Sequence, residues 1–203
     1  MLSDLQQAIK TTFFKFLDGQ IDVTDFEQWI YQTSILEEVL ESDDYLELIS
    51  LDFTRRNEKH YLDCRYQINK IIEKYIALGE YETWKLTKLL NTFLNRKGDL
   101  IELLGQFYDL YCHGYGFLDN LGLHYGLEFC DYDLETLSEA EIAERLHRLL
   151  PEIDKEIEKV LSWLERGKIK IIDDPDFLYG IDYIDDRSEL EKIPIYKIRK
   201  INC

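Results

Sequence analysis

Cysteine is scarce in this sequence, and its spacing suggests no shared site. Cys64, Cys112, Cys130 and Cys203 form no C-x-x-C pair and follow no pattern of metal ligands. A disulfide framework is typical of short secreted domains. This chain of 203 residues is longer than such a domain, and it does not begin with a secretory signal pattern. We therefore expect free thiols.

Long uncharged apolar runs are also missing. None approaches the roughly 18 residues that a membrane-spanning helix needs. The first residues, Met1 to Asp4, contain no basic region and lead directly into an amphipathic helical pattern, which is unlike a secretory signal. Both absences predict a cytoplasmic protein.

No stretch carries a catalytic signature. The sequence contains no glycine-rich phosphate loop, no G-x-S-x-G elbow and no H-E-x-x-H or H-x-H pair. Cys112 and His113 are adjacent, but neighbours on a helix point about 100° apart, so they would not act on one another. The residues alone therefore name no reaction, and we expect no cofactor.

Basic residues are outnumbered, with 24 Lys and Arg against 41 Asp and Glu and a formal net charge of −17. Nucleic acids and anionic membranes bind through clustered Lys and Arg, so this balance excludes them as expected partners. It favours a basic protein partner, which the charge would attract over a long range. Solubility alone is an equally good explanation of the same charge.

The apolar content, 45% of the residues with 13% aromatic, is ample for a core. Apolar positions recur at helical spacing as far as Gly167, and β-branched residues then dominate. We predict a mainly α protein: a helical bundle domain over residues 1–167 and a small β-sheet or hairpin over 168–203. The expected strands are 168–172, 178–184 and 193–201.

Several helix ends can be read locally. Gly19, Gly79 and Gly167 are expected to stop helices. Ser138 with Glu141 forms a capping box, and Pro151 is expected to open a separate helix after it.

The stretch from Leu100 to Phe129 should lie at the centre of the helical domain because its apolar stripe is wide and aromatic. Its glycines predict a break near Gly114–Gly116 and a restart near Asn120. Gly122 and Gly126 are four residues apart, which indicates close helix packing. The stretch is also rich in tyrosine, a residue common both in cores and in protein contact surfaces. These tyrosines are Tyr108, Tyr111, Tyr115, Tyr125 and Tyr132.

One set of residues could serve chemistry. Asp109 and His113 lie four apart, Glu102 lies two turns earlier, and His124 could fold back after the break. Imidazole with carboxylates can bind a metal ion or exchange protons, so a metal-dependent enzyme or ligand pocket is the alternative function. The plainer interpretation is that both histidines fill polar positions near a helix break.

The N-terminal region resembles one known group of proteins. The run Phe26 to Tyr31, then Leu36-Glu37, then Asp44 to Leu51, is similar to a pattern in small bacterial immunity-type proteins. These proteins are encoded beside secreted or contact-delivered toxins and neutralise them in the cytosol. The resemblance implies a binding protein rather than an enzyme, and it transfers no individual functional residue.

Combined with the charge, this makes an inhibitor of a basic toxin, for instance a nuclease, the leading hypothesis. It would occlude the toxin's active site or mimic a polyanionic substrate. A helical scaffold that self-associates through aromatics is a third possibility. The predicted contact residues are Asp43, Asp44, Glu47, Asp173, Asp174, Asp176, Asp182, Asp185 and Asp186.

Overall fold

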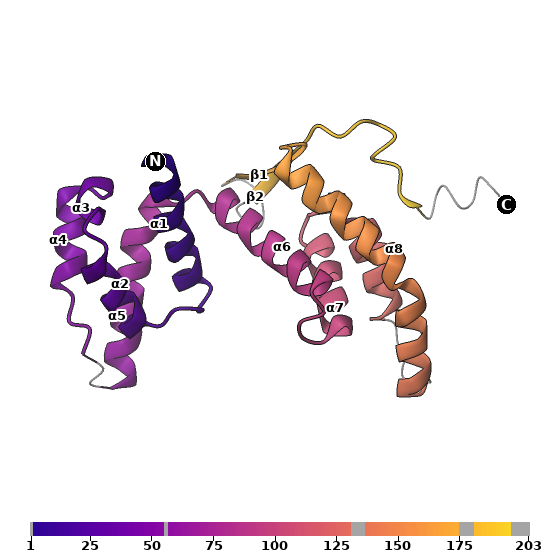
Figure 1. Ribbon diagram of the computed structural model, residues 1–203, viewed down its shortest axis with the longest axis horizontal. Coiled ribbons are helices and arrows are strands. Elements are labelled where there is room, and N and C mark those ends of the chain that lie inside the picture. The colour runs from indigo at the N-terminus through magenta and orange to yellow at the C-terminus, as the bar shows by residue number, and fades with distance from the viewer. Residues whose placement is uncertain (1, 55–56, 131–136, 175–180, 196–203) are drawn as a thin grey trace. The chain divides into compact units, whose positions relative to one another are not determined.

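The computed structural model describes residues 2–54, 57–130, 137–174 and 181–195, and within them the protein is mainly helical with one small antiparallel hairpin (Figure 1). This confirms the predicted fold class. The chain divides into two compact units, Met1–Ala77 and Leu78–Cys203, and each has its own apolar core. The domain boundary that the sequence predicts, at residue 168, differs from this division after Ala77 and stays a prediction.

The first unit is built from short helices around a phenylalanine core. Phe13, Phe16 and Phe26 are buried, and the ring centres of Phe16 and Phe26 lie 4.4 Å apart. Gly19 ends the first helix with a positive φ of 75°, as predicted. Asp22 caps the second helix by accepting a hydrogen bond from the backbone N–H of Asp25. The elements are α1 (Leu2–Leu17), α2 (Val23–Gln32), α3 (Leu36–Val39), α4 (Ser42–Ser50), α5 (Glu58–Ile72) and the 3-10 turn η1 (Glu73–Tyr75).

The centre of the second unit contains the predicted break. Helix α7 (Leu100–Cys112) ends before Gly114, whose φ is 104°, and a 3-10 turn η2 (Gly116–Leu118) follows. The chain then restarts as a π-helix, η3 (Asn120–Gly126), so the break and the restart are both confirmed.

Close packing at the two later glycines is also confirmed. A Cβ on Gly126 would lie 2.7 Å from the carbonyl oxygen of Leu104, and one on Gly122 would lie 2.5 Å from the Cβ of Tyr111. Real Cβ atoms do not approach so closely, so the backbone of η3 can lie against α7 only because both residues lack a side chain.

Helix α8 (Glu139–Glu165) begins as predicted, because Ser138 and Glu141 form a capping box. The expectation that Pro151 opens a separate helix is wrong, since Pro151 lies inside α8. A proline interrupts the backbone hydrogen bonding of a helix. Here the apolar face continues through it to Ile153 and Ile157, which are fully buried, and this burial favours one continuous helix.

The prediction for Gly79 is wrong as well. Helix α5 ends at Ile72, and Gly79 lies in the first turn of α6 (Leu78–Leu94). The carboxylate of Asp173 accepts hydrogen bonds from the backbone N–H groups of Leu78 (3.1 Å) and Gly79 (2.6 Å). Asp173, which is far from α6 in sequence, therefore caps the N-terminus of this helix. A Cβ on Gly79 would overlap the backbone of Ile171, so glycine serves close approach here.

The hairpin pairs β1 (Ile169–Asp173) with β2 (Ile181–Asp185), close to the first turn of α6 and the end of α8 (Figure 1). Ile169 and Ile171 bury one face of it. Two of the three predicted strands are thus present. Residues 193–195, the described part of the third, do not form a strand, so the prediction is wrong there, and residues 196–201 lie outside the described part. In the described ranges, no helix combines the length and the apolar character needed to cross a membrane.

Candidate functional site

The acidic run of the first unit forms an exposed surface, which we call the α3–α4 acidic surface. Helices α3 and α4 pack beside one another, and α4 packs on α5 (Figure 1). Within the described residues, none of the carboxylates of this surface makes a hydrogen bond or an ion pair. Leu46 lies between two of them on α4 and is 58% exposed. The acidic residues of the surface are Glu37, Glu38, Glu41, Asp43 and Glu47.

Asp44 belongs to the same run but points inward. It is buried, its Oδ1 lies 2.6 Å from Lys74 Nζ, and its Oδ2 accepts a hydrogen bond of 2.6 Å from the Tyr75 hydroxyl. The hydrogen bonds from Lys74 and Tyr75 lower the pKa of Asp44 below its ordinary value. Burial and the bond to Asp44 raise the pKa of Tyr75 to about 12. Asp44 therefore connects α4 to the 3-10 turn η1 that follows α5.

The acidic residues of the hairpin do not form one face. Asp173 caps α6, and Asp185 pairs with the buried guanidinium of Arg187 at 2.8 Å. In the hairpin register, Asp185 lies opposite Ile169 on the core-facing side, while Asp182 lies opposite Ile172 on the other side. Of the other predicted contact residues, Asp174 is half-buried, Asp186 is exposed and Asp176 lies outside the described residues.

The possible metal ligands of the central stretch are not assembled. The His113 ring lies against the backbone carbonyl oxygen of Asp109, with Nδ1 at 2.5 Å. His124 packs on the Tyr125 ring with the ring centres 4.6 Å apart. Throughout the described ranges, no group of three or more His, Cys, Asp or Glu side chains is placed to hold a metal ion. Glu102 is exposed on α7.

The central tyrosines mainly build the core. Tyr115 and Tyr125 are buried, Tyr108 and Tyr111 are half-buried, and Tyr132 lies outside the described residues. The Tyr115 hydroxyl donates to Glu82, and burial together with that carboxylate raises its pKa. Among the described residues, Tyr31 and Tyr66 of the first unit are exposed aromatic residues.

Sequence reasoning named only part of the α3–α4 acidic surface. It missed Glu37, Glu38 and Glu41, although seven acidic residues and no basic residue occur between Glu37 and Asp52. That run was the available signal, and it does not say which carboxylates face solvent.

Comparison of the chain with protein-family models, with curated proteins and with solved structures finds no significant match. The functional argument therefore rests on the residues and the geometry of this chain.

Proposed function

We propose that this chain is a binding protein that uses the α3–α4 acidic surface to hold a basic protein, and that it acts as an immunity-type inhibitor of a toxin in the cytoplasm. One observation carries the proposal: five carboxylates within eleven residues are exposed and lack any partner in the described structure. Exposed side chains that lack partners keep their charge available to another molecule.

The position of Asp44 supports this use of the surface. Its bonds to Lys74 and Tyr75 fix α4, so the neighbouring carboxylates of Asp43 and Glu47 are carried by an anchored helix. A fixed array of charge costs less ordering entropy on binding than a mobile one. Leu46 adds an apolar contact between the two carboxylates, and a mixed apolar and charged surface is typical of protein interfaces.

Inhibition would follow from charge and position. A basic toxin is attracted by the negative field, and the association rate rises with electrostatic complementarity. The bound acidic surface then covers cationic residues that the toxin uses for its substrate. This mechanism needs no catalytic residue in the inhibitor.

The test is a comparison of two neutralised variants. The surface variant removes four carboxylates of the α3–α4 acidic surface, and the matched control removes four exposed carboxylates of the second unit. Each is used to capture partners from the lysate and secreted proteins of the source organism, and association rates are measured with the purified partner. The surface variant is E37Q/E38Q/D43N/E47Q, and the control is E102Q/D109N/E144Q/E165Q.

We expect wild type and control to retain one basic protein, and the surface variant to bind it with an association rate lower by about tenfold or more. The rate with wild type should fall as salt is added, because salt screens charges beyond about 10 Å. An association rate that is indifferent to salt, or an equal loss in both variants, would overturn the proposal.

A further inference from the structure

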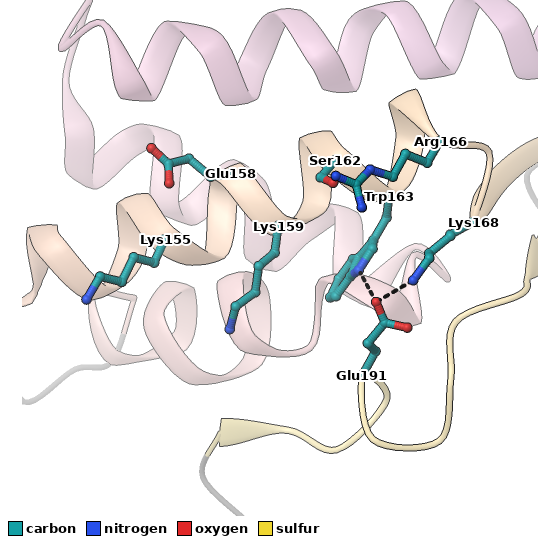
Figure 2. Close-up of a pocket in the computed structure, with 8 residues that line it drawn as sticks. All are labelled: Lys155, Glu158, Lys159, Ser162, Trp163, Arg166, Lys168 and Glu191. Carbon is teal, nitrogen blue, oxygen red and sulfur yellow. Dashed lines mark hydrogen bonds and ion pairs between the residues drawn. The ribbon is translucent and has the colours of Figure 1, made fainter.

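A groove of about 410 Å³ runs along the C-terminal half of α8 in the second unit. Figure 2 shows it bounded by α8 on one side and by the chain around Glu191 on the other. Its volume falls in the range of small-molecule sites, which is about 300–1,000 Å³. The residues that line it include Lys155, Lys159, Ser162, Trp163, Arg166 and Lys168.

The groove is basic, although the chain as a whole has a net charge of −17. Four cationic side chains line it, against the two carboxylates of Glu158 and Glu191. Figure 2 shows that Glu158 extends away from Lys155 and Lys159. The local charge is therefore opposite to that of the molecule.

Three of the cations and one hydroxyl follow one face of α8. Lys155, Lys159, Ser162 and Arg166 are separated by four, three and four residues, which keeps them on one side of a helix. At a rise of about 1.5 Å per residue, Lys155 and Arg166 lie roughly 16 Å apart along the axis. A ligand in the groove could meet cations at both ends.

One end of the groove already holds a carboxylate. Glu191 accepts hydrogen bonds from Lys168 Nζ at 2.6 Å and from the indole N–H of Trp163 at 3.3 Å (Figure 2). Its other oxygen accepts from the backbone N–H and the hydroxyl of Ser188. The bond from Lys168, followed by those from Ser188, lowers the pKa of Glu191 to about 2. The donors at this end thus stabilise an anion.

The other cationic side chains of the groove differ in whether they already form an ion pair. Lys159 pairs with the buried carboxylate of Glu156, which also accepts from Asn120 at 3.0 Å. The side chains of Lys155 and Arg166 make no hydrogen bond or ion pair with any residue that the structure describes. Trp163, held by the Arg187 guanidinium 4.5 Å from its ring, gives the groove a rigid wall between them.

We propose that this groove binds a small ligand with at least two phosphate or carboxylate groups. Lys155 and Arg166 supply the free charge at its two ends, and Ser162 offers a hydroxyl donor between them. Lys159 adds charge while it remains paired with Glu156. Charge-assisted hydrogen bonds to such groups are the strongest that a site of this kind can form. The site is independent of the α3–α4 acidic surface, which lies in the other unit.

The test uses titration calorimetry with inorganic tripolyphosphate and, in parallel, with citrate. The double variant K155Q/R166Q removes the two unpaired cations. The matched control, K97Q/R148Q, removes one Lys and one Arg that are exposed elsewhere in the same unit. Lys97 and Arg148 lie outside the groove, and the two variants have the same net charge.

We expect wild type and control to bind one of the two probes equally, and K155Q/R166Q to bind it at least about tenfold more weakly. The probe that binds identifies the anionic group. In a proton–nitrogen correlation spectrum, the indole signal of Trp163 should shift on binding and that of Trp29 should not. If neither probe binds to wild type, if both variants bind alike, or if the Trp163 signal stays in place, the proposal is overturned.

Discussion

At the scale of single residues, every buried charge in the described part of the chain has a partner of opposite charge. Asp44, Glu156 and Arg187 are the buried charged residues of the described structure. Each has an oppositely charged partner, namely Lys74, Lys159 and Asp185. A buried charge without a partner is strongly destabilising, so these pairs fix the conformation of the segments that carry them.

The substitution D44N should lower the free energy of unfolding by about 1–3 kcal/mol, because it weakens the charge-assisted hydrogen bonds from Lys74 and Tyr75. The matched control is D43N, which changes an exposed neighbour that has no partner in the described part and should alter stability by less than about 0.5 kcal/mol. Urea unfolding of both variants gives the two values. Equal effects would contradict the anchoring role of Asp44.

The stability difference between wild type and D44N should also depend on pH. The pKa of Asp44 is lower in the folded chain than its ordinary value of 3.8, so its contribution is complete above that value and is lost as the pH falls through the folded pKa. The pKa of Tyr75 is instead raised from 10.0 to about 12, so its contribution is present below 10 and is lost between these two values. Unfolding curves across the pH range, with Y75F as the second variant, measure both windows. A difference that persists unchanged in strong acid would count against the assignment to Asp44.

At the scale of elements, the packing of η3 on α7 depends on residues without side chains. Gly122 and Gly126 allow the two backbones to approach, and a Cβ on either would meet backbone atoms of α7. Gly105 lies on α7 itself, where a Cβ would make only an ordinary contact of 3.6 Å with Cys130 Sγ. The same substitution should therefore have opposite effects at the two kinds of position.

We expect G126A to lower the unfolding free energy by about 1–3 kcal/mol, because overpacking forces the backbone to move. G105A should raise it by up to about 1 kcal/mol, since alanine favours a helix interior over glycine. Thermal and urea unfolding of the two variants provide the comparison. A destabilising G105A, or a neutral G126A, would show that the close approach of η3 to α7 is not as described.

At the scale of the whole molecule, the chain has two separate cores. Trp29 packs against Phe13 and Phe26 in the first core, whereas Trp84 and Trp163 belong to the second unit. The three tryptophans are the only ones in the sequence, so each unit can be followed by its own signal.

Unfolding should therefore respond separately to substitutions in the two units. With fluorine-labelled tryptophan, D44N should lower the midpoint that Trp29 reports and leave the midpoints of Trp84 and Trp163 unchanged. G126A should do the reverse. Multidomain chains commonly depart from a single two-state transition. If all three signals shift together in both variants, the two units unfold as one.

The sequence by itself determined the features that depend on neighbours along the chain. The stop at Gly19, the capping box at Ser138 and the break before Gly116 are local signals, and each was confirmed. The mainly helical class follows from apolar periodicity, which also depends only on nearby residues. Close packing at Gly122 and Gly126 could be predicted from their spacing, although its partner could not.

The tertiary structure decided the features that depend on residues far apart in sequence. Asp43 and Asp44 are adjacent and alike, yet only Asp44 meets Lys74, thirty residues away. Asp173 starts a helix almost a hundred residues before it, which no local pattern at Gly79 reveals. The groove on α8 forms because Glu191, a residue outside this helix, lies next to Trp163 on it. Charge and periodicity in the sequence set which residues are available, and long-range packing selects which of them stay exposed to bind.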